Sequence, residues 1–256
     1  MRFARHTWSF YRRQARNALR MPSALFLANF QPIVWMFLFG QLFRSVALLQ
    51  GFGTSSYIQF LAPGIAMMTS MFGAFYSGLG MLGDIQSGLL DRLLAMPIRR
   101  GAVLAGPLLY TATQTVVQAA LILVIACLLG ARPHGGVLGI LMILTASALL
   151  GVAFGALSNG LALTTRRQQT LIAVVNFVSL PLTFLSSMTM THSLMPAWIR
   201  MVARVNPVDW AVRAGRNAFE GTSWQEIGLS LALLAGFSAL CSLWATRAFR
   251  KYQQTL

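Results

Sequence analysis

Acidic side chains are the scarcest feature of this sequence, and charge of either sign is uncommon. Five of the 256 residues are Asp or Glu, and charged residues together make up 10% of the chain. Hydrophobic residues make up 56%, which is too large a share for a soluble domain of this length. A soluble helical bundle is therefore strongly disfavoured, and the composition indicates a membrane protein.

The sequence features of an enzyme are also missing. There is no Gly-rich phosphate loop of the Walker type, so the chain is not expected to bind a nucleoside triphosphate in that way. No nucleophile has a base at motif spacing, and the three histidines, His6, His134 and His192, are scattered. Cys127 and Cys241 fall in apolar runs, so neither a disulfide framework nor a metal site is predicted. We expect a non-catalytic chain without a cofactor of its own.

What the chain has in abundance is long stretches without charge. Five stretches between consecutive charged residues exceed twenty residues, and a sixth, 227–246, has twenty. A helix needs about 20 apolar residues to cross the hydrocarbon core of a bilayer. The stretches predict six membrane spans, at 24–43, 57–83, 102–129, 137–163, 169–190 and 227–246. No acidic residue lies inside these spans, which counts against a proton- or sodium-driven carrier, because such carriers commonly use buried carboxylates.

Basic residues are distributed unevenly along this pattern. With six spans, both termini lie on one side of the membrane, and that side carries fourteen of the 20 Lys and Arg residues. The excess places both termini in the cytoplasm by the positive-inside rule, in a multi-pass protein of the plasma membrane. It also accounts for the net charge of +15 without a nucleic-acid partner. The first twenty residues hold six arginines and no apolar core, so no cleavable signal peptide is expected.

Two segments outside the spans have amphipathic patterns. Residues 4–20 place Trp8 and Tyr11 on one side and arginines on another, as in a helix that lies in the membrane interface and faces lipid phosphates. Contact of this helix with a motor protein is a compatible alternative. Residues 192–226 predict two short outer helices, around 196–204 and 208–220, which dip back into the bilayer. Asp209 and Glu220 lie at helical spacing from Arg213 and Arg216, where local ion pairs worth little are the default expectation.

The segment 84–100 carries two of the five acidic residues between two long uncharged runs. On a helical wheel its leucines fill one half, and Asp84, Asp91 and Arg92 lie in the other. Pro97 then ends the helix, and Arg99 with Arg100 marks a return to the membrane surface. A helix of this kind lies flat under a bilayer and presents its charged face to the water. The pattern predicts a docking helix for a separate motor protein.

The order of these elements resembles the membrane subunits of the ABC-2 exporters, and among them the daunorubicin-resistance (DrrB-like) branch. The resemblance covers essentially the whole chain and rests on the order of several short motifs. These are Phe60-Leu-Ala-Pro-Gly64, Gly88-Leu-Leu-Asp-Arg92 with Met96-Pro-Ile-Arg99, Leu180-Pro-Leu-Thr-Phe-Leu-Ser186, and Met195-Pro-Ala-Trp198 before Asn206-Pro207. One departure is that Gly106, at the start of the third span, is followed by Pro107 where such proteins often have a basic residue.

The resemblance implies an all-α membrane protein with the ABC-2, or type V exporter, fold. Residues 1–256 then form one transmembrane domain of six spans, with an interfacial helix at 4–20, a cytoplasmic coupling helix at 84–98 and outer re-entrant helices at 192–226. It further implies a second membrane subunit, identical or homologous, and cytoplasmic ATPase subunits that hold ATP and Mg. The residues expected to dock the ATPase are Asp84, Gly88, Leu90, Asp91, Arg92, Leu93, Pro97 and Arg99.

The expected function is ATP-driven export of hydrophobic drugs, antibiotics or lipids. Spans one, two and five are expected to line the path, with Phe37, Met68, Phe72, Phe177 and Phe184 as candidate lining residues. Two alternatives are an ABC-2 exporter of lipid-linked polysaccharide and, from another class, a channel or membrane scaffold that needs no motor. The sequence leaves open which molecule is moved and whether the two membrane subunits are identical. Export is favoured over import because no docking feature for a binding protein is evident.

Overall fold

The computed structural model describes residues 2–20, 22–43, 57–95, 100–188, 190–191 and 195–254. Throughout these residues the chain is helical or in short connections, and no strand occurs among them. The helices are α1 (Arg2–Leu19), α2 (Pro22–Leu42), α3 (Tyr57–Tyr76), α4 (Gly78–Gln86), α5 (Leu89–Ala95), α6 (Arg100–Leu128), α7 (Gly136–Thr165), α8 (Gln168–Phe184), α9 (Ala197–Ala203), α10 (Pro207–Glu220) and α11 (Trp224–Gln253).

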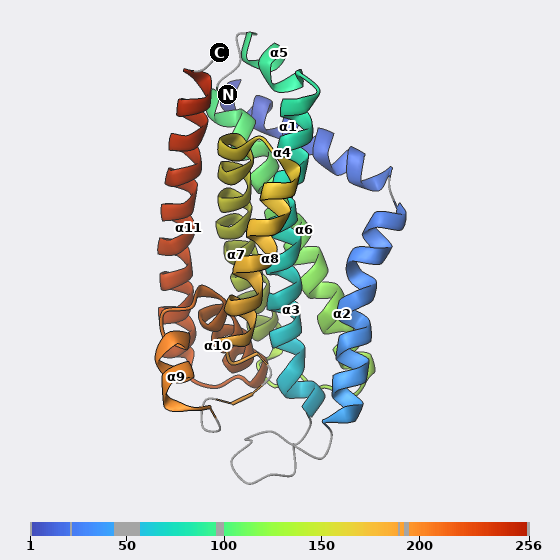
Figure 1. Cartoon of the computed structure of the whole chain (residues 1–256). Helices are drawn as coiled ribbons and strands as arrows, with labels where there is room; N and C mark the ends of the chain where they lie inside the picture. Colours follow the sequence, from blue (N-terminus) through green and yellow to red (C-terminus); the bar gives the residue numbers. More distant parts are fainter. Residues whose placement is uncertain are drawn as a thin grey trace.

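The helices form a bundle around α7, which packs against α3, α6, α10 and α11 (Figure 1). Helix α1 lies across one end of this bundle, and α5 is at the same end together with both chain termini. The short helices α9 and α10 lie at the opposite end, and α2 stands at the side of the bundle. The two ends of the molecule are therefore built differently, one from α1 and α5 and the other from α9 and α10.

Four helical stretches in the described part of the chain are long and apolar enough to cross a membrane. They are Tyr57–Gln86, which comprises α3 and α4, together with Gly101–Leu128, Gly136–Thr165 and Trp224–Gln253. The spans expected at 24–43 and 169–190 correspond to α2, with 21 residues and no charged side chain, and to α8, a shorter apolar helix of 17 residues. The all-helical membrane architecture is as predicted, and four of the six expected spans meet this criterion of length and composition.

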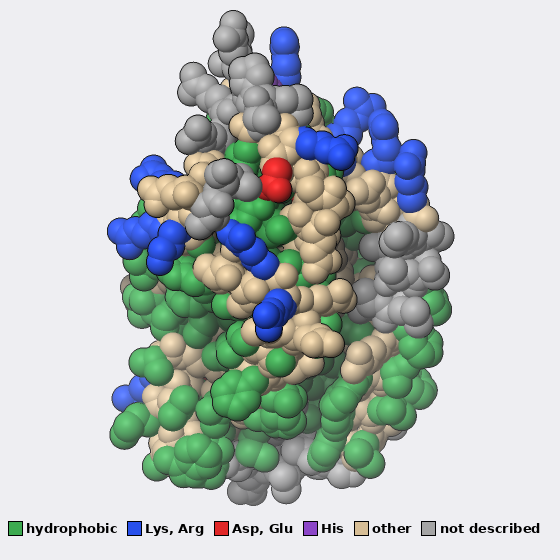
Figure 2. Space-filling view, turned by 45° about the horizontal axis from the view of Figure 1, so that its top comes forward, with side chains coloured by type: hydrophobic (Ala, Val, Ile, Leu, Met, Phe, Trp, Pro, Cys, Tyr) green, Lys and Arg blue, Asp and Glu red, His purple; other side chains and the backbone are tan. Residues whose placement is uncertain are grey.

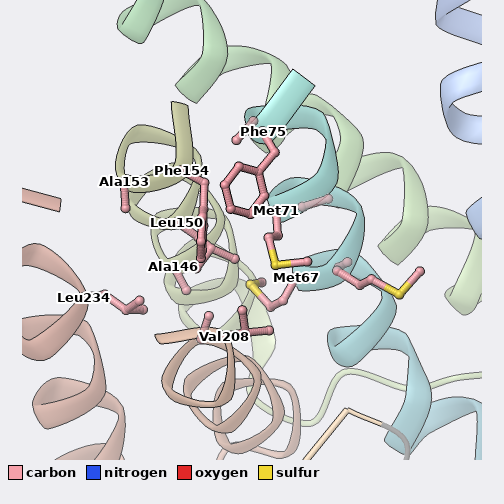
Figure 3. Close-up of a cluster of buried hydrophobic side chains, with 14 of the residues drawn as sticks. Met67, Met71, Phe75, Ala146, Leu150, Ala153, Phe154, Val208 and Leu234 are labelled. Atoms are coloured by element: carbon pink, nitrogen blue, oxygen red, sulfur yellow. The ribbon is translucent and has the colours of Figure 1, made fainter. Parts of the chain in front are cut away.

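Large side chains of α3 and α7 form the centre of the core. Met67, Met71 and Phe75 of α3 lie against Leu150 and Phe154 of α7, and Val208 of α10 and Leu234 of α11 complete the cluster (Figure 3). Phe75 and Phe154 have ring centroids 4.6 Å apart at an angle of 52°, a tilted arrangement that aromatic pairs favour. Because these side chains come from elements far apart in the sequence, they join α3, α7, α10 and α11 into one body.

Small and hydroxyl side chains bring α6 and α7 close together. A Cβ atom on Gly151 would lie 2.4 Å from Thr115 Oγ1, so only glycine allows this approach. Ser147 Oγ donates to the Thr115 carbonyl at 2.9 Å and is 2.8 Å from Ser70 Oγ on α3. Interhelical hydrogen bonds inside membranes contribute on average about 0.6 kcal/mol each. The set therefore adds specificity to the packing of three helices more than it adds stability.

Candidate functional site

The segment predicted as a docking helix over 84–98 consists of two helices in the described residues. Helix α4 ends at Gln86 and α5 begins at Leu89, with Ser87 and Gly88 between them. Gly88 has a φ of +66°, a left-handed conformation that favours glycine, and a Cβ there would meet nothing within 4 Å. Backbone conformation, and not side-chain crowding, is therefore the reason for glycine at this joint. The amphipathic pattern by itself does not reveal this break, because it runs through Gly88 without a change of period.

The predicted docking residues separate into an exposed and a buried set. Asp91 and Arg92 are exposed on α5, and Gly88 is half-buried. Leu90 is only 1% exposed and belongs to the hydrophobic core, and Leu93 packs against that core. Leu90 and Leu93 therefore hold α5 on the bundle, and Asp91 and Arg92 of its polar half stay exposed. Pro97 and Arg99 lie outside the described residues.

Asp91 connects α5 to the last helix of the chain. The Tyr252 hydroxyl of α11 donates a hydrogen bond to Asp91 Oδ1 at 2.8 Å. The Arg166 guanidinium, from the turn between α7 and α8, lies over the Tyr252 ring at 4.6 Å, a cation–π contact. Three segments that are far apart in the sequence therefore meet at Tyr252. Sequence reasoning missed Tyr252, because nothing local in the basic tail pairs it with a residue 161 positions earlier.

Asp84 connects α4 to the N-terminal helix. Its Oδ2 accepts a hydrogen bond from Arg13 Nη2 and forms an ion pair with it, with 20% of the Asp84 and 28% of the Arg13 side chain exposed. Helix α1 itself is seated on α6, where a Cβ on Gly106 would lie 2.3 Å from Phe10 Cβ. The Gly106-Pro107 departure noted in the sequence thus falls at a close approach of α1 to α6. The predicted docking residue Asp84 has a partner within the same chain.

The candidate path residues do not all lie on one surface. Phe37 of α2 is exposed, and Phe177 and Phe184 of α8 are 80% and 71% exposed. Met68 is buried in the core, and Phe72 is half-buried against it. Aromatic side chains therefore occupy the outer faces of α2 and α8, whereas Met68 serves packing.

A polar pair lies beside the exposed aromatic side chains of α8. The Tyr76 hydroxyl of α3 donates to Asn176 Oδ1 of α8 at 3.2 Å, and both residues are exposed. Asn176 lies inside the fifth predicted span, 169–190. The pair adds hydrogen-bonding groups to a face that is otherwise apolar.

At the opposite end of the molecule, α10 has a buried carboxylate, Asp209, and a half-buried arginine, Arg216. The Asp209 side chain is fully buried, pairs with Arg213 Nε at 2.9 Å and accepts a hydrogen bond from the Ser187 backbone N–H at 2.7 Å. Arg216 donates to the Ser187 carbonyl at 2.8 Å and lies 3.5 Å from the centre of the Phe60 ring. The expected local pair of Asp209 with Arg213 forms, and tertiary packing buries its carboxylate while leaving 35% of the Arg213 side chain exposed.

Arg216 remains a cation in this half-buried position. Burial lowers the pKa of its guanidinium to about 10, and the carboxylates of Asp209 and Glu220 partly offset the shift. Since about 10 is well above neutral pH, the group stays protonated. The Asp209 carboxylate offsets its charge. The hydrogen bond to the Ser187 carbonyl and the cation–π contact with the Phe60 ring stabilise it further.

Asn206 brings two of the sequence motifs together. Its Oδ1 accepts from the Val208 N–H at 2.9 Å and caps α10, with Pro207 in the first turn. Its Nδ2 donates to the carbonyls of Leu182 and Leu185, at 2.8 and 3.0 Å. The Asn206-Pro207 motif therefore holds the end of α8, where Pro181 and the following residues belong to another motif. The two motifs are therefore hydrogen-bonded to each other at the end of α8.

Comparison with known proteins agrees with this architecture. Residues 5–219 match the family model described as ABC-2 type transporter. Over 220 residues the chain is 27% identical to the daunorubicin resistance ABC transporter permease protein DrrB1 of Streptomyces coeruleorubidus, covering 86% of this chain and 77% of that one. It is 30% identical over 206 residues to a transport permease of Porphyra purpurea named ycf38, covering 80% and 70%. It is 25% identical over 240 residues to a doxorubicin resistance ABC transporter permease protein of Mycobacterium tuberculosis named DrrC, covering 93% and 84%. The family match spans most of the chain, and the protein therefore belongs to the ABC-2 type transporter family.

Proposed function

We propose that this chain is the membrane subunit of an ABC exporter that moves hydrophobic drugs, antibiotics or lipids out of the cytoplasm or the inner leaflet. Separate ATPase subunits hold ATP and Mg and supply the energy. The observation that carries this proposal is the polar face of α5, where Asp91 and Arg92 are exposed at the end of the bundle that also holds both termini. The names of the relatives DrrB1 and DrrC support a drug substrate.

In this proposal α2 and α8 complete a set of six spans, and α1 and α5 lie on the cytoplasmic side of the membrane, with α1 at the interface. Both termini at one end of the bundle fit an even number of spans (Figure 1). Lys and Arg side chains gather toward the end with α1 and α5, and hydrophobic side chains cover the lower flanks (Figure 2). The positive-inside rule then assigns the basic end to the cytoplasm. Helices α9 and α10 lie toward the outer leaflet.

Movement of the ATPase subunits reaches the spans through the contacts of α4 and α5. Leu90 anchors α5 in the core, Asp91 holds the end of α11 through Tyr252, and Asp84 holds α1 through Arg13. When ATP draws the ATPase subunits together, a force on α5 is passed to α11 and α1, which tilts the spans as a body. The exposed aromatic faces of α2 and α8 then meet the second membrane subunit or the transported molecule.

The first experiment purifies the tagged chain from its own membranes in mild detergent. ATPase subunits are expected to co-purify, and addition of a hydrophobic amphiphile is expected to accelerate ATP hydrolysis. The variant Asp91→Ala/Arg92→Ala should lose the co-purifying subunits or the acceleration. A matched control is Arg132→Ala/Glu226→Ala, which removes one exposed base and one exposed acid from other parts of the chain. This control should behave as wild type.

Two results would contradict the proposal. A wild-type chain that purifies without any ATPase subunit is a motor-independent channel or scaffold. Full acceleration in the Asp91→Ala/Arg92→Ala variant would remove α5 from the docking surface. Transport of a panel of amphiphiles into inverted vesicles then identifies the substrate class.

A further inference from the structure

Helix α1 carries a groove in which four of the six lining residues are arginine. A cavity of about 380 Å³ lies along this helix and is lined by Ser9, Arg12, Arg13, Arg16, Asn17 and Arg20. These positions are three or four residues apart, so they share one side of the helix. Four arginine residues therefore line one small volume.

The charge in this groove is largely unbalanced by the protein. Arg13 pairs with Asp84. Among the described residues, Arg12, Arg16 and Arg20 have no ion pair with a carboxylate. Like charges at these spacings repel one another. An anion bound between the arginines is attracted by each of them and offsets this repulsion. Arginine presents a planar fork of donors that matches the oxygens of a phosphate group. The chemistry of the groove thus favours a phosphate.

The surroundings of the groove indicate where this phosphate comes from. Trp8 and Leu19, 58% and 75% exposed, lie next to the arginines, because Trp8 is four residues before Arg12 and Leu19 three after Arg16. Phe10, on another side of α1, is buried at the contact with Gly106 of α6. Helix α1 therefore has an anchored side, an exposed apolar strip and an arginine strip in succession. An apolar strip beside a basic strip is the surface that an interfacial helix presents to acyl chains and headgroups.

We propose that this groove is a binding site for the phosphate headgroup of an anionic phospholipid, with Arg12, Arg16 and Arg20 as its main ligands. Trp8 and Leu19 contact the acyl region of the same lipid layer. The bound phosphate neutralises the arginines around Arg13 and leaves Arg13 to Asp84, at the base of the segment that docks the ATPase. Lipid binding is thereby linked to the attachment of α1 to α4. This last link rests on the proposed function, whereas the lipid site itself does not.

The test measures lipid retention by the chain alone, in nanodiscs of phosphatidylcholine with and without phosphatidylglycerol. Native mass spectrometry after transfer to detergent counts the phosphatidylglycerol molecules that stay bound. Wild type should retain phosphatidylglycerol in preference to phosphatidylcholine. The variant Arg12→Gln/Arg16→Gln should bind phosphatidylglycerol at least about tenfold more weakly than wild type. The reason is that each basic residue at an anionic surface adds substantially to the binding free energy. The matched control, Arg247→Gln/Arg250→Gln, removes two exposed arginines from the end of α11 and should retain lipid as wild type does.

Each other outcome overturns the assignment. Equal loss in the α11 control would mean attraction by general charge, and equal retention in the α1 variant would mean no site in the groove. Inorganic phosphate that displaces the lipid at millimolar concentration would assign the site to a soluble phosphate. A lowered unfolding temperature of the α1 variant in phosphatidylcholine alone would assign Arg12 and Arg16 to the fold. Because no ATPase subunit is present, these results are independent of whether the protein is an exporter.

Discussion

Single residues at both ends of the bundle carry contacts that reach across the whole chain. Tyr252 connects α11 to Asp91 of α5, and Asp209 connects α10 to the turn after α8 through the Ser187 N–H. The two sites differ in solvent exposure, because Asp91 is exposed and the Asp209 side chain is fully buried. We therefore expect substitutions at Tyr252 and Asp91 to change how ATPase movement is transmitted to the spans. Substitutions at Asp209 should change the stability of the fold.

Tyr252→Phe tests the coupling role. The change removes the hydrogen bond to Asp91 and keeps the ring that faces Arg166, so the loss of stability should be small, about 0.5–1.5 kcal/mol. The ATPase subunits should still co-purify, and the acceleration of ATP hydrolysis by an amphiphile should fall. Tyr11→Phe is the control, because the described residues give the Tyr11 hydroxyl no hydrogen-bond partner. Full acceleration in Tyr252→Phe would show that α11 takes no part in coupling.

Asp209→Ala tests the stability role. It leaves Arg213 without its ion pair and the buried Ser187 N–H without its acceptor. A buried donor that loses its partner costs about 1–3 kcal/mol. The unfolding temperature in detergent should fall by several degrees or more. Glu226→Ala removes an exposed acid that bonds Asn217 and should have little effect. Equal unfolding temperatures for the two variants would contradict the buried network.

At the scale of elements, the joint between α4 and α5 determines how α5 is presented. Gly88 ends one helix in a left-handed conformation and lets the next start in a new direction. Leu90 then fixes α5 on the core, and Asp91 and Arg92 face outward. A continuous helix through this point would rotate the polar residues relative to the bundle.

Gly88→Ala is expected to strain this joint. A left-handed conformation costs a residue with a Cβ about 1–2 kcal/mol, and no neighbouring atom within 4 Å would clash with the methyl group. Stability and amphiphile-accelerated ATP hydrolysis should both decrease. Gly83→Ala is the matched control, since Gly83 lies inside α4 and also has nothing within 4 Å of its Cβ position. Because alanine favours helix, that control should be neutral or slightly stabilising, and identical behaviour of the two variants would exclude a role for the joint.

At the scale of the whole molecule, the bundle has a basic end with α1 and α5 and an opposite end with α9 and α10. Orientation in the membrane follows from this asymmetry in our proposal. This orientation determines whether the exposed face of α5 can contact a cytoplasmic ATPase. A direct test of sidedness is therefore the most general test of the function.

Labelling with a membrane-impermeant maleimide measures this sidedness. Cys127 and Cys241, both free, are first replaced by serine or alanine. Ser87→Cys, in the joint before α5, should be labelled in inverted vesicles and not in intact cells, and Gln225→Cys, at the start of α11, should behave in the opposite way. Both positions are exposed. Labelling of Ser87→Cys in intact cells would place α5 outside and would end the exporter proposal.

Local patterns in the sequence determined the membrane class, the positions of the apolar helices and the basic character of one end. They also placed short helices near 196–204 and 208–220, where α9 and α10 lie. These properties depend on the hydropathy of consecutive residues and on the backbone preferences of glycine, proline and asparagine, which act over a few positions. A single sequence is sufficient to read them.

Tertiary structure alone decided which side chains of those patterns are available and which are used inside the chain. Leu90 was expected at the docking surface and lies in the core, and Asp84 and Asp91 hold Arg13 and Tyr252, 71 and 161 residues away. Packing also buried Asp209 of the expected local pair with Arg213, and it placed Arg216 against the Ser187 carbonyl. Such contacts join helices that are distant along the chain, and their partners depend on how the helices pack. No local period or motif records that packing.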